Sequence, residues 1–564
     1  MAKNMTGSDT FQLTVRFPYQ AKSASLGWGG WSTLTLILII TILGVMGSLV
    51  EYTPILNKPQ SDPNEKPDKR LNSLGLALFS FSFKNNLSKL FEVSEKGDQD
   101  LRILNGIRVI SICWVVLGHT FMISMGTRLT NIISALSTLD NWYFALVPGG
   151  FFAVDMFFYM SGFLTFYLLT LKMHPKRGWA NFPMVYFHRW FRLFTPAVFC
   201  ILLCNFIFIH LGSGPDYNES WDMGCQKYWW SSLIFINNIV PWNQVSCMSW
   251  FWYLANDFEF FLISPIIIFV YCRSRVAGYG LTGAVMLFNF IHVMVMTAKY
   301  DLGIMLTLDN PADFMGLTYL KPWSRFSSYG VGGIIGFMYF EYKRDQKASA
   351  NPEIQNYQAS FASKVFLAPK ISTLMTYGYF IVGLFMMTFL VFIQYDFYKH
   401  QLMINPWSKF SNMLFNGFSR ALFVLGLTFI ILPTFNNRLT WIKVFLGSDF
   451  MVVMGRLTFA VYLMHIPWMI FFFADLRQGY WMSNLSGWTL VLSTVPISFL
   501  FAIPFSMYAE VPFMNLEKYF LMPKPAPKKE TVSEFKKIEA HERINFTKDS
   551  EEKIPMLSDK EMQQ

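Results

Sequence analysis

The chain has 564 residues, of which 53% are hydrophobic, 18% aromatic and 15% charged, and its formal net charge is +10. This composition excludes a disordered protein and supplies more apolar side chain than one soluble core could bury. No basic helix stands apart from the apolar runs, so the positive charge does not indicate nucleic-acid binding. The runs are about twenty residues long, the length that crosses a bilayer, and they predict an all-α, polytopic membrane helix bundle.

Eleven apolar runs follow one another along the chain, and we interpret them as one N-terminal anchor and a core of ten transmembrane helices. The predicted spans are 33–50, 103–124, 146–171, 193–211, 250–271, 277–297, 326–340, 373–394, 413–433, 455–474 and 487–509. We see no internal repeat among them.

The Lys and Arg residues of the short loops fall mainly on one side of this bundle, which the positive-inside rule makes cytosolic. The first span alone carries the opposite bias, because Arg16 and Lys22 precede it. We base the predicted orientation on the Lys and Arg residues of all the later loops taken together. The resulting organisation is an extracytosolic N-terminal segment (1–32), the anchor (33–50), a cytosolic linker (51–100), a transmembrane domain (101–520) and a flexible charged cytosolic tail (521–564).

The linker contains an amphipathic stretch, Leu74 to Leu90, that we expect to lie on the membrane surface. The tail begins with a Pro- and Lys-rich segment and carries equal numbers of acidic and basic residues. It is therefore predicted to be a solvated extension.

Arg108 and His119, both in the second span, are the first candidates for chemistry. Eleven residues at about 100° each place them within about 20° of one helical face and roughly 16 Å apart along the axis. Arginine suits a phosphate group, and histidine can take and return a proton near neutral pH. We expect the two side chains to bound one water-accessible chamber open to the cytosol. The alternative is a snorkelling arginine and a histidine held by a neighbouring helix.

Further ionisable residues fall inside spans, where charge is costly and often functional. Asp155 and Tyr159 share a face of the third span with Gly162, which favours a cavity wall, although an aspartate anchoring the helix end is the alternative. Asp257 lies early in the fifth span and needs a cation or hydrogen bonds to stay charged.

Two later spans each carry one such residue. Arg420 in the ninth span must face protein or water, and either an ion pair with Asp155 or Asp257 or a purely structural pair explains it. His465 lies midway along the tenth span. A hydrogen bond between helices explains His465 as well as catalysis does, so we rank it below His119.

Five stretches in this order resemble the acyltransferase 3 membrane family, and within it the eukaryotic branch that is similar to the nose-resistant-to-fluoxetine proteins. They are Arg108 with His119, Val154–Leu164, Trp250–Asp257, Leu457–His465 and Glu510–Lys518. The resemblance runs from about Ser80 to Lys518. The first 32 residues hold no counterpart of the branch's large cysteine-rich N-terminal domain, so we do not expect functions tied to that domain to transfer.

The resemblance implies roles for several residues. His119 matches the family's catalytic histidine, and Asp257 matches an acidic position, whereas Glu259 departs from the family pattern. Arg189 and Arg192 lie in a basic segment expected at the cytosolic mouth, where they would hold donor phosphates with Arg108; positive-inside topology alone also explains them.

The same resemblance extends to two outer regions. Lys321 and Arg325 belong to a stretch on the outer side of the predicted topology, and we tie them to the acceptor. Together with Arg420, His465 and Tyr159 they are predicted to contact the acceptor or to line the pore. Cys225 and Cys247 resemble the branch's paired cysteines, and a disulfide between them requires an oxidising compartment. Asn218 fits a glycosylation acceptor, a pattern that is common by chance.

These observations predict an integral membrane O-acyltransferase that moves an acyl group from a cytosolic acyl-CoA-type donor to a hydroxyl of a lipid, glycan or small molecule. His119 would act as general base or form an acyl intermediate, and Asp257 or Asp155 would orient its imidazole. We expect no tightly bound cofactor, no metal site and no nucleic-acid partner, and membrane lipids and acyl-CoA as partners, in a eukaryotic endomembrane or plasma membrane. The alternatives are a transporter or lipid-handling protein that uses the same charges, and a catalytically silent member of the family.

Overall fold

The computed structural model describes residues 26–56, 70–93, 99–215, 217–221, 224–242, 246–304, 314–350, 358–399 and 406–521. Across these ranges the chain is a bundle of long helices with no β-strand, and a single isolated bridge joins Leu129 to Tyr480. Most of the predicted N-terminal segment and almost all of the predicted tail lie outside the described residues. The all-α prediction is confirmed.

The helices vary from single turns to more than six turns. The long ones are α2 (Trp28–Leu49), α6 (Ile103–Gly126), α8 (Gly150–Met173), α9 (Phe182–Phe206), α12 (Trp252–Arg273), α13 (Arg275–Tyr300), α15 (Phe326–Ser349), α17 (Thr373–Phe392), α19 (Lys409–Ile431), α21 (Asp449–Ala474) and α22 (Asn484–Ala509). The short ones are α4 (Ser73–Ser80), α5 (Phe83–Phe91), α7 (Ile132–Leu136), α10 (Tyr217–Ser220), α11 (Cys225–Leu233), α16 (Phe361–Ile371), α18 (Tyr395–Tyr398), α20 (Thr440–Leu446) and α23 (Val511–Leu516).

Ten helices in the described ranges are long and apolar enough to cross a membrane. The predicted span that does not meet this criterion is 326–340, which forms the first two thirds of α15. The second half of α15 carries charged residues, including Glu341 and Asp345. The predicted linker amphipath is split into α4 and α5, and Ser82 caps α5 by accepting a hydrogen bond from the Asn85 main-chain nitrogen.

Several helix starts differ from the sequence prediction, and three differ by at least five residues, including α21, which starts at Asp449, six residues before the expected span. Helix α2 starts at Trp28, five residues before the expected anchor. Helix α9 starts at Phe182, eleven residues before the expected fourth span, because the Asn181 side chain caps its first turn and Pro183 occupies that turn. The segment that holds Arg189 and Arg192 is therefore helical rather than a loop.

Helices α8 and α15 form the closest pair in the bundle. Gly162 of α8 and Gly332 and Gly336 of α15 lie against main-chain carbonyl oxygens of the partner helix, so that an added Cβ at any of them would clash. Small residues spaced by four allow helix backbones to approach in this way within a membrane. This contact explains why the polar α15 is held inside the bundle.

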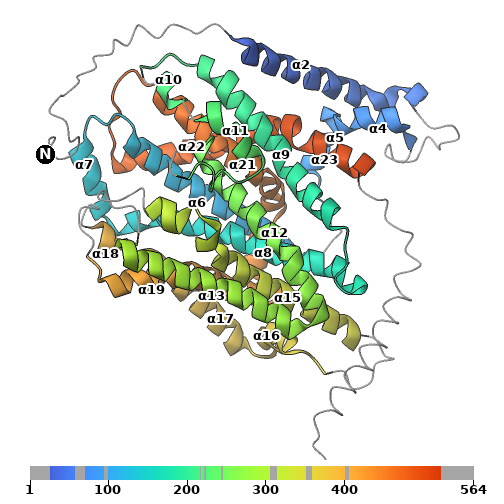
Figure 1. Ribbon diagram of the computed structural model, residues 1–564, viewed down its shortest axis with the longest axis vertical. Coiled ribbons are helices and arrows are strands. Elements are labelled where there is room, and N and C mark those ends of the chain that lie inside the picture. The colour runs from blue at the N-terminus through green and yellow to red at the C-terminus, as the bar shows by residue number, and fades with distance from the viewer. Residues whose placement is uncertain are drawn as a thin grey trace, which may run out of the picture.

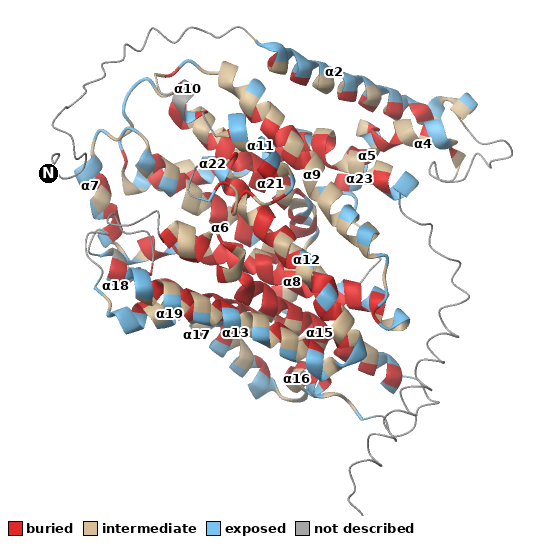
Figure 2. Cartoon of the chain, viewed as in Figure 1, coloured by how far each residue is buried: buried red, intermediate tan, exposed pale blue. Residues whose placement is uncertain are grey.

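Burial separates a central group of helices from a peripheral one. Buried residues are concentrated on α8, α12, α15 and α21, whereas α2 and α17 expose most of their surface (Figure 2). In the most apolar stretch of each helix, 78% of the α8 residues are buried but only 22% of the α17 residues. The peripheral helices therefore provide the lipid-facing surface, and the polar residues of α8, α12 and α21 lie inside.

The short helices mark two opposite ends of the bundle. Helices α4, α5, α16 and α23 lie at one end, and α7, α10 and α18 lie at the other (Figure 1). We call these the α5 end and the α18 end. Arg108 lies in the half of α6 nearer the α5 end, because α6 starts there at Ile103.

Candidate functional site

Helix α6 directs Arg108 and His119 toward the inside of the bundle. Ile110, which is 42% exposed, lies nine residues from His119 and therefore about 180° away around the helix. The other face of α6 packs against α8, α21 and α22. The shared face that periodicity predicts is thus an interior face, and neither side chain is turned to the lipid.

A cavity of about 650 Å³ lies beside Arg108, within the size range of small-molecule sites. We call it the basic chamber, because its lining contains Arg108, Arg189, Arg192, Arg456, Lys89 and Lys172. Its acidic lining residues are Asp257 and Glu510. Leu164, Leu168 and Phe261 are among the apolar residues that complete the wall. The chamber therefore combines a large excess of positive charge with apolar surface.

Arg108 and Arg192 are the two arginines in this chamber that the described protein leaves unpaired. Neither donates a hydrogen bond or forms an ion pair with a described group, and the guanidinium groups of Arg192 and Arg189 repel that of Arg108. Glu510 attracts Arg192 electrostatically. Cations gathered without direct partners in a partly enclosed cavity favour binding of an anion such as a phosphate.

Arg189 is held differently, by a three-residue cluster. Its Nη2 donates to the Ser161 hydroxyl at 3.0 Å and to a carboxylate oxygen of Asp257, and Ser161 donates to the other Asp257 oxygen at 2.5 Å. The guanidinium also lies 5.0 Å from the centre of the Phe261 ring. Asp257 therefore fixes Arg189 in the chamber wall and cannot orient His119, contrary to the sequence prediction.

Helix α5 covers part of the chamber at the α5 end, where Lys89 and Leu90 line it. Arg456 of α21 fastens the end of this helix. Its Nη1 donates to the main-chain oxygens of Lys89, Leu90 and Glu92 at 2.7–2.8 Å. A guanidinium at the carboxyl end of a helix satisfies carbonyls that lack intrahelical partners.

The chamber ends one helical turn before His119. Its last lining residue on α6 is Val115, and its last on α21 is Tyr462, with Tyr253 of α12 beside them. The centres of the Tyr253 and Tyr462 rings are 5.2 Å apart, and the ring planes are inclined at 61°. We expected Arg108 and His119 to bound one chamber, but this pair of tyrosines separates the histidine from the cavity.

Beyond the tyrosines, His119 and His465 form a direct pair. His465 Nε2 and His119 Nδ1 are 3.0 Å apart, and His465 Nδ1 lies 3.1 Å from the main-chain oxygen of Val461. His465 is fully buried, and His119 is half-buried. His465 thus contacts His119 directly, in the position that the sequence assigned to a carboxylate.

Asp155 lies in a second polar cluster on another face of α8. Arg325 Nη1 donates to both Asp155 oxygens, at 3.1 and 2.9 Å, and the Ser328 hydroxyl donates to one of them at 2.8 Å. Arg325 and Asp155 are 0% and 1% exposed. Asp155 therefore contacts Arg325 and Ser328, and not the imidazole that it was predicted to orient. Its ion-pair partner is Arg325 rather than Arg420.

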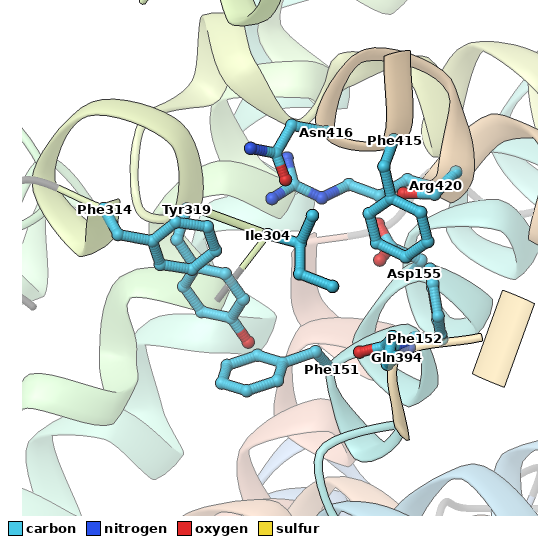
Figure 3. Close-up of a pocket in the computed structure, with 11 residues that line it drawn as sticks. Phe151, Phe152, Asp155, Ile304, Phe314, Tyr319, Gln394, Phe415, Asn416 and Arg420 are labelled. Atoms are coloured by element: carbon cyan, nitrogen blue, oxygen red, sulfur yellow. The ribbon is translucent and has the colours of Figure 1, made fainter. Parts of the chain in front are cut away.

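Arg420 lies in the same cluster and lines a cavity of about 30 Å³ (Figure 3). Its Nη1 donates to the main-chain oxygens of Thr318 and Ser324, both at 2.9 Å. Figure 3 shows Asp155 and Arg420 beside Phe152 and Phe415. We call this cavity the Arg420 pocket. It is separate from the basic chamber.

The remaining residues that we tied to the acceptor do not line the chamber. The Tyr159 hydroxyl pairs with that of Thr428 at 3.0 Å. Lys321 donates to the main-chain oxygen of Asn238 at 2.5 Å and lies 4.0 Å from the centre of the Trp242 ring. The residues that we tied to the acceptor therefore do not form one site, and each makes its own contacts within the bundle.

The segment between α9 and α12 contains the other two predicted features. Cys225 and Cys247 are joined in a disulfide. Asn218 lies in the short helix α10, but its side chain is outside the described part of the chain, so its glycosylation stays a prediction.

Sequence reasoning missed Ser161, Tyr253, Tyr462 and Arg456, which bound or brace the chamber. All except Arg456 fall inside the motif stretches that carried the resemblance, and Arg456 immediately precedes one. Serine and tyrosine are too common in membrane helices for their type to reveal a site. Their position inside the motifs was the available signal.

The family model for the acyltransferase domain matches residues 101–507. The chain belongs to this acyltransferase family. The match includes Arg108, His119, both chamber arginines of α9 and His465, and it begins at the expected start of the transmembrane domain. It confirms the resemblance that the five stretches indicated.

Two proteins of Caenorhabditis elegans are similar to this chain. Nose resistant to fluoxetine protein 6 is 26% identical over 461 residues, which are 77% of this chain and 52% of that protein. Regulator of hypoxia-inducible factor 1 is 24% identical over 242 residues, which are 40% of this chain and 44% of that protein. The chain thus covers about half the length of each relative. No solved structure matches it.

Proposed function

We propose that this protein is an integral membrane O-acyltransferase that takes an acyl group from a cytosolic acyl-CoA-type donor. The acceptor is a hydroxyl of a lipid, a glycan or a small molecule. The observation that carries the proposal is the arrangement of the basic chamber and the histidines: Arg108 of α6 and Arg192 of α9 line the chamber without a hydrogen-bond partner among the described residues, and a pair of histidines follows farther along α6 and α21. Family membership supports the reaction class.

The basic chamber would hold the donor. Arg108 and Arg192 are free to bind phosphate oxygens, and Arg189 is already oriented by Asp257 and Ser161. Arginine forks bind phosphates through paired hydrogen bonds. The apolar wall formed by residues such as Leu164 and Leu168 suits the acyl chain or the pantetheine arm.

His119 Nε2 would be the basic atom. The Val461 carbonyl can only accept, so His465 Nδ1 carries a proton and, in the neutral ring, His465 Nε2 accepts. The contact between the rings then requires a proton on His119 Nδ1. That leaves the lone pair on His119 Nε2. His465 acts as a positioning residue that selects this tautomer, as a hydrogen-bond partner commonly does for histidine.

The reaction follows from this assignment. His119 Nε2 accepts the proton of the acceptor hydroxyl while the oxygen attacks the thioester carbonyl carbon. The C–O bond forms, the C–S bond breaks, and the protonated Nε2 returns its proton to the leaving thiolate. No carboxylate among the described residues contacts either ring, so His465 is the only side-chain hydrogen-bond partner of the charged imidazole.

Tyr253 and Tyr462 would act as the barrier between donor and base. The acyl carbon must pass them to reach His119, so one of the two rings moves aside when donor and acceptor are both bound. This keeps the thioester away from the base until then and limits its hydrolysis.

We place the α5 end in the cytosol. The connections at this end carry Lys172, Lys176, Arg177, Arg273, Arg275, Lys343, Arg344, Lys364, Lys370, Arg438 and Lys443, which agrees with the positive-inside rule. The Cys225–Cys247 disulfide precedes α12 on the other side, in a compartment that would be oxidising. The chamber mouth then faces the cytosolic donor.

The experiment is acceptor-dependent CoA release. Purified full-length protein is incubated with labelled acyl-CoA and membrane extract, and both free CoA and labelled product are followed. We expect product from the wild type and at least a 1,000-fold lower rate from His119→Ala, because general-base catalysis contributes about 10²–10⁴-fold and positioning is also lost.

The matched control is His292→Ala, which changes a histidine of α13 that lines neither cavity. It should retain the wild-type rate. Equal product from His119→Ala and wild type, at equal amounts of folded protein, would remove His119 as the base. Solute flux across sealed vesicles without donor would instead support a transporter.

A further inference from the structure

The Arg420 pocket contains an uncompensated buried charge. The charged groups that act on Arg420 are Arg325 and Asp155. Asp155 is engaged by Arg325 and Ser328, so this pair is neutral. Arg420 is 8% exposed and makes no ion pair with a described residue. The cluster therefore carries one excess positive charge.

An isolated charge in a medium of low polarity is costly unless a counter-ion or strong hydrogen bonds compensate it. Arginine cannot avoid this free-energy cost by losing its proton, because its guanidinium stays charged in proteins. The main-chain oxygens of Thr318 and Ser324 accept hydrogen bonds only from Arg420 Nη1. The remaining guanidinium nitrogens of Arg420 donate to no group in the described ranges. These nitrogens are the donors left to the pocket.

The walls restrict what can enter. The cavity of about 30 Å³ has room for two or three waters or one small ion, since a single water needs about 10–15 Å³. Phe151, Phe152 and Phe415 line it, and Figure 3 shows Phe415 on the same side of the pocket as Arg420 and Phe151 on the opposite side, beyond Ile304. Aromatic ring edges carry positive partial charge and tolerate an anion.

We propose that the Arg420 pocket binds one small inorganic anion of the chloride type. A water molecule cannot neutralise the guanidinium, and an organic anion exceeds the space. Ser419, which is buried and has no hydrogen-bond partner among the described groups, lines the same pocket and supplies a second donor. The Asn416 amide nitrogen already donates to Thr297 and Gly303, whereas that of Gln394 donates to Leu390 and keeps one N–H. Arg420 and Ser419 therefore form the site, and the second Gln394 N–H is a further donor in the pocket wall.

The bound anion would hold α19 against α8, because the pocket lies between Arg420 of α19 and the phenylalanines of α8. It serves stability rather than acyl transfer. The site is on a different face of α8 from the basic chamber, and the inference does not depend on the proposed enzymatic activity.

The test is halide-dependent thermal unfolding of the purified full chain. Melting temperature is measured by tryptophan fluorescence while sodium chloride replaces sodium gluconate at constant ionic strength. We expect a saturable rise of about 3 °C, as for any ligand that binds only the folded state, and the same rise with bromide. Identical melting temperatures in chloride and gluconate would overturn the proposal.

Two variants locate the effect. Arg420→Gln should abolish the halide response, whereas Arg477→Gln, which alters an arginine bonded to Ser213, should keep it. Ser419→Ala leaves every charge in place and should raise the chloride concentration at half-effect about fivefold, the usual cost of one hydrogen bond. This second variant decides the matter if Arg420→Gln does not fold. A response unchanged in Ser419→Ala, with Arg420→Gln either unfolded or also unchanged, would refute the site.

Discussion

Helix α8 separates two polar regions that are built from the same residue types but differ in pairing. In the basic chamber, Arg108 and Arg192 make no hydrogen bond or ion pair with a described residue, and the cavity around them measures about 650 Å³. In the cluster around the Arg420 pocket, Arg325 is fully buried against Asp155 and the free space is about 30 Å³. Unpaired charge beside a large cavity indicates an organic ligand, whereas the paired Arg325 and Asp155 indicate structure, and the small space beside the unpaired Arg420 admits at most a small ion.

The comparison also explains how one helix serves both regions. Ser161 and Leu164 of α8 face the chamber, and Asp155 faces the Arg420 pocket. Residues six apart on a helix differ by about 120° in direction. Because the glycines of α8 and α15 fix the position of this helix, neither region can shift without the other.

The largest expected effect concerns the positioning histidine above the chamber. His465→Phe removes the side-chain acceptor for the His119 Nδ1 proton and leaves the Val115 main-chain carbonyl as the hydrogen-bond partner of the ring. We expect product formation to fall about 100-fold through kcat, less than when a histidine is forced fully into the wrong tautomer. His465→Gln can still accept through its amide oxygen and should remain within about tenfold of wild type. Steady-state kinetics of CoA release measure both.

The two variants separate positioning from packing. Equal losses in His465→Phe and His465→Gln would show that His465 serves only to fill space between α6 and α21. ¹⁵N-histidine spectra supply a readout that does not depend on activity, since a protonated Nδ1 and an unprotonated Nε2 have distinct shifts. A His119 resonance protonated at Nε2 would contradict the assignment.

Local periodicity made part of the site predictable. The shared face of Arg108 and His119 follows from their spacing on one helix, and the structure confirms that this face is interior. The His119–His465 contact joins residues 346 positions apart, and no helical pattern encodes it. The sequence offered Asp257 or Asp155 as the partner of the imidazole, whereas packing brings His465 to that position.

The same limit applies to charge pairing. Asp257 was expected to need a cation or hydrogen bonds, and Arg189 and Ser161 provide both. Which cation would do so depended on where α9 starts, and the basic residues His188, Arg189 and Arg192 in its first half concealed the start at Phe182. A prediction based on apolar runs does not detect the polar ends of amphipathic helices, so it locates those ends poorly.

The next largest expected effect concerns the ion pair of Arg325 and Asp155 beside the Arg420 pocket. Arg325→Gln leaves Asp155 without its partner in a buried site, and we expect the free energy of unfolding to fall by about 3 kcal/mol. Reversible denaturation by SDS in mixed micelles measures the change. The double variant Asp155→Asn with Arg325→Gln removes both charges and should recover at least half of the loss. No recovery would indicate that Arg325 stabilises through Tyr319 instead, to whose main-chain oxygen it also donates.

The smallest expected effect on stability comes from the same substitution, arginine to glutamine, at Arg108 in the basic chamber. It compares the two polar regions most directly. Arg108→Gln removes an unpaired charge that other arginines repel, so we expect the free energy of unfolding to stay within about 0.5 kcal/mol of wild type. The KM for the acyl donor should rise about 30-fold, since a charged hydrogen bond to a phosphate contributes roughly 2 kcal/mol, with little change in kcat. A large loss of stability with an unchanged KM would assign Arg108 to structure. Because Arg108 and Arg325 then receive one identical change, only their partners and surrounding space can account for any difference between the two results.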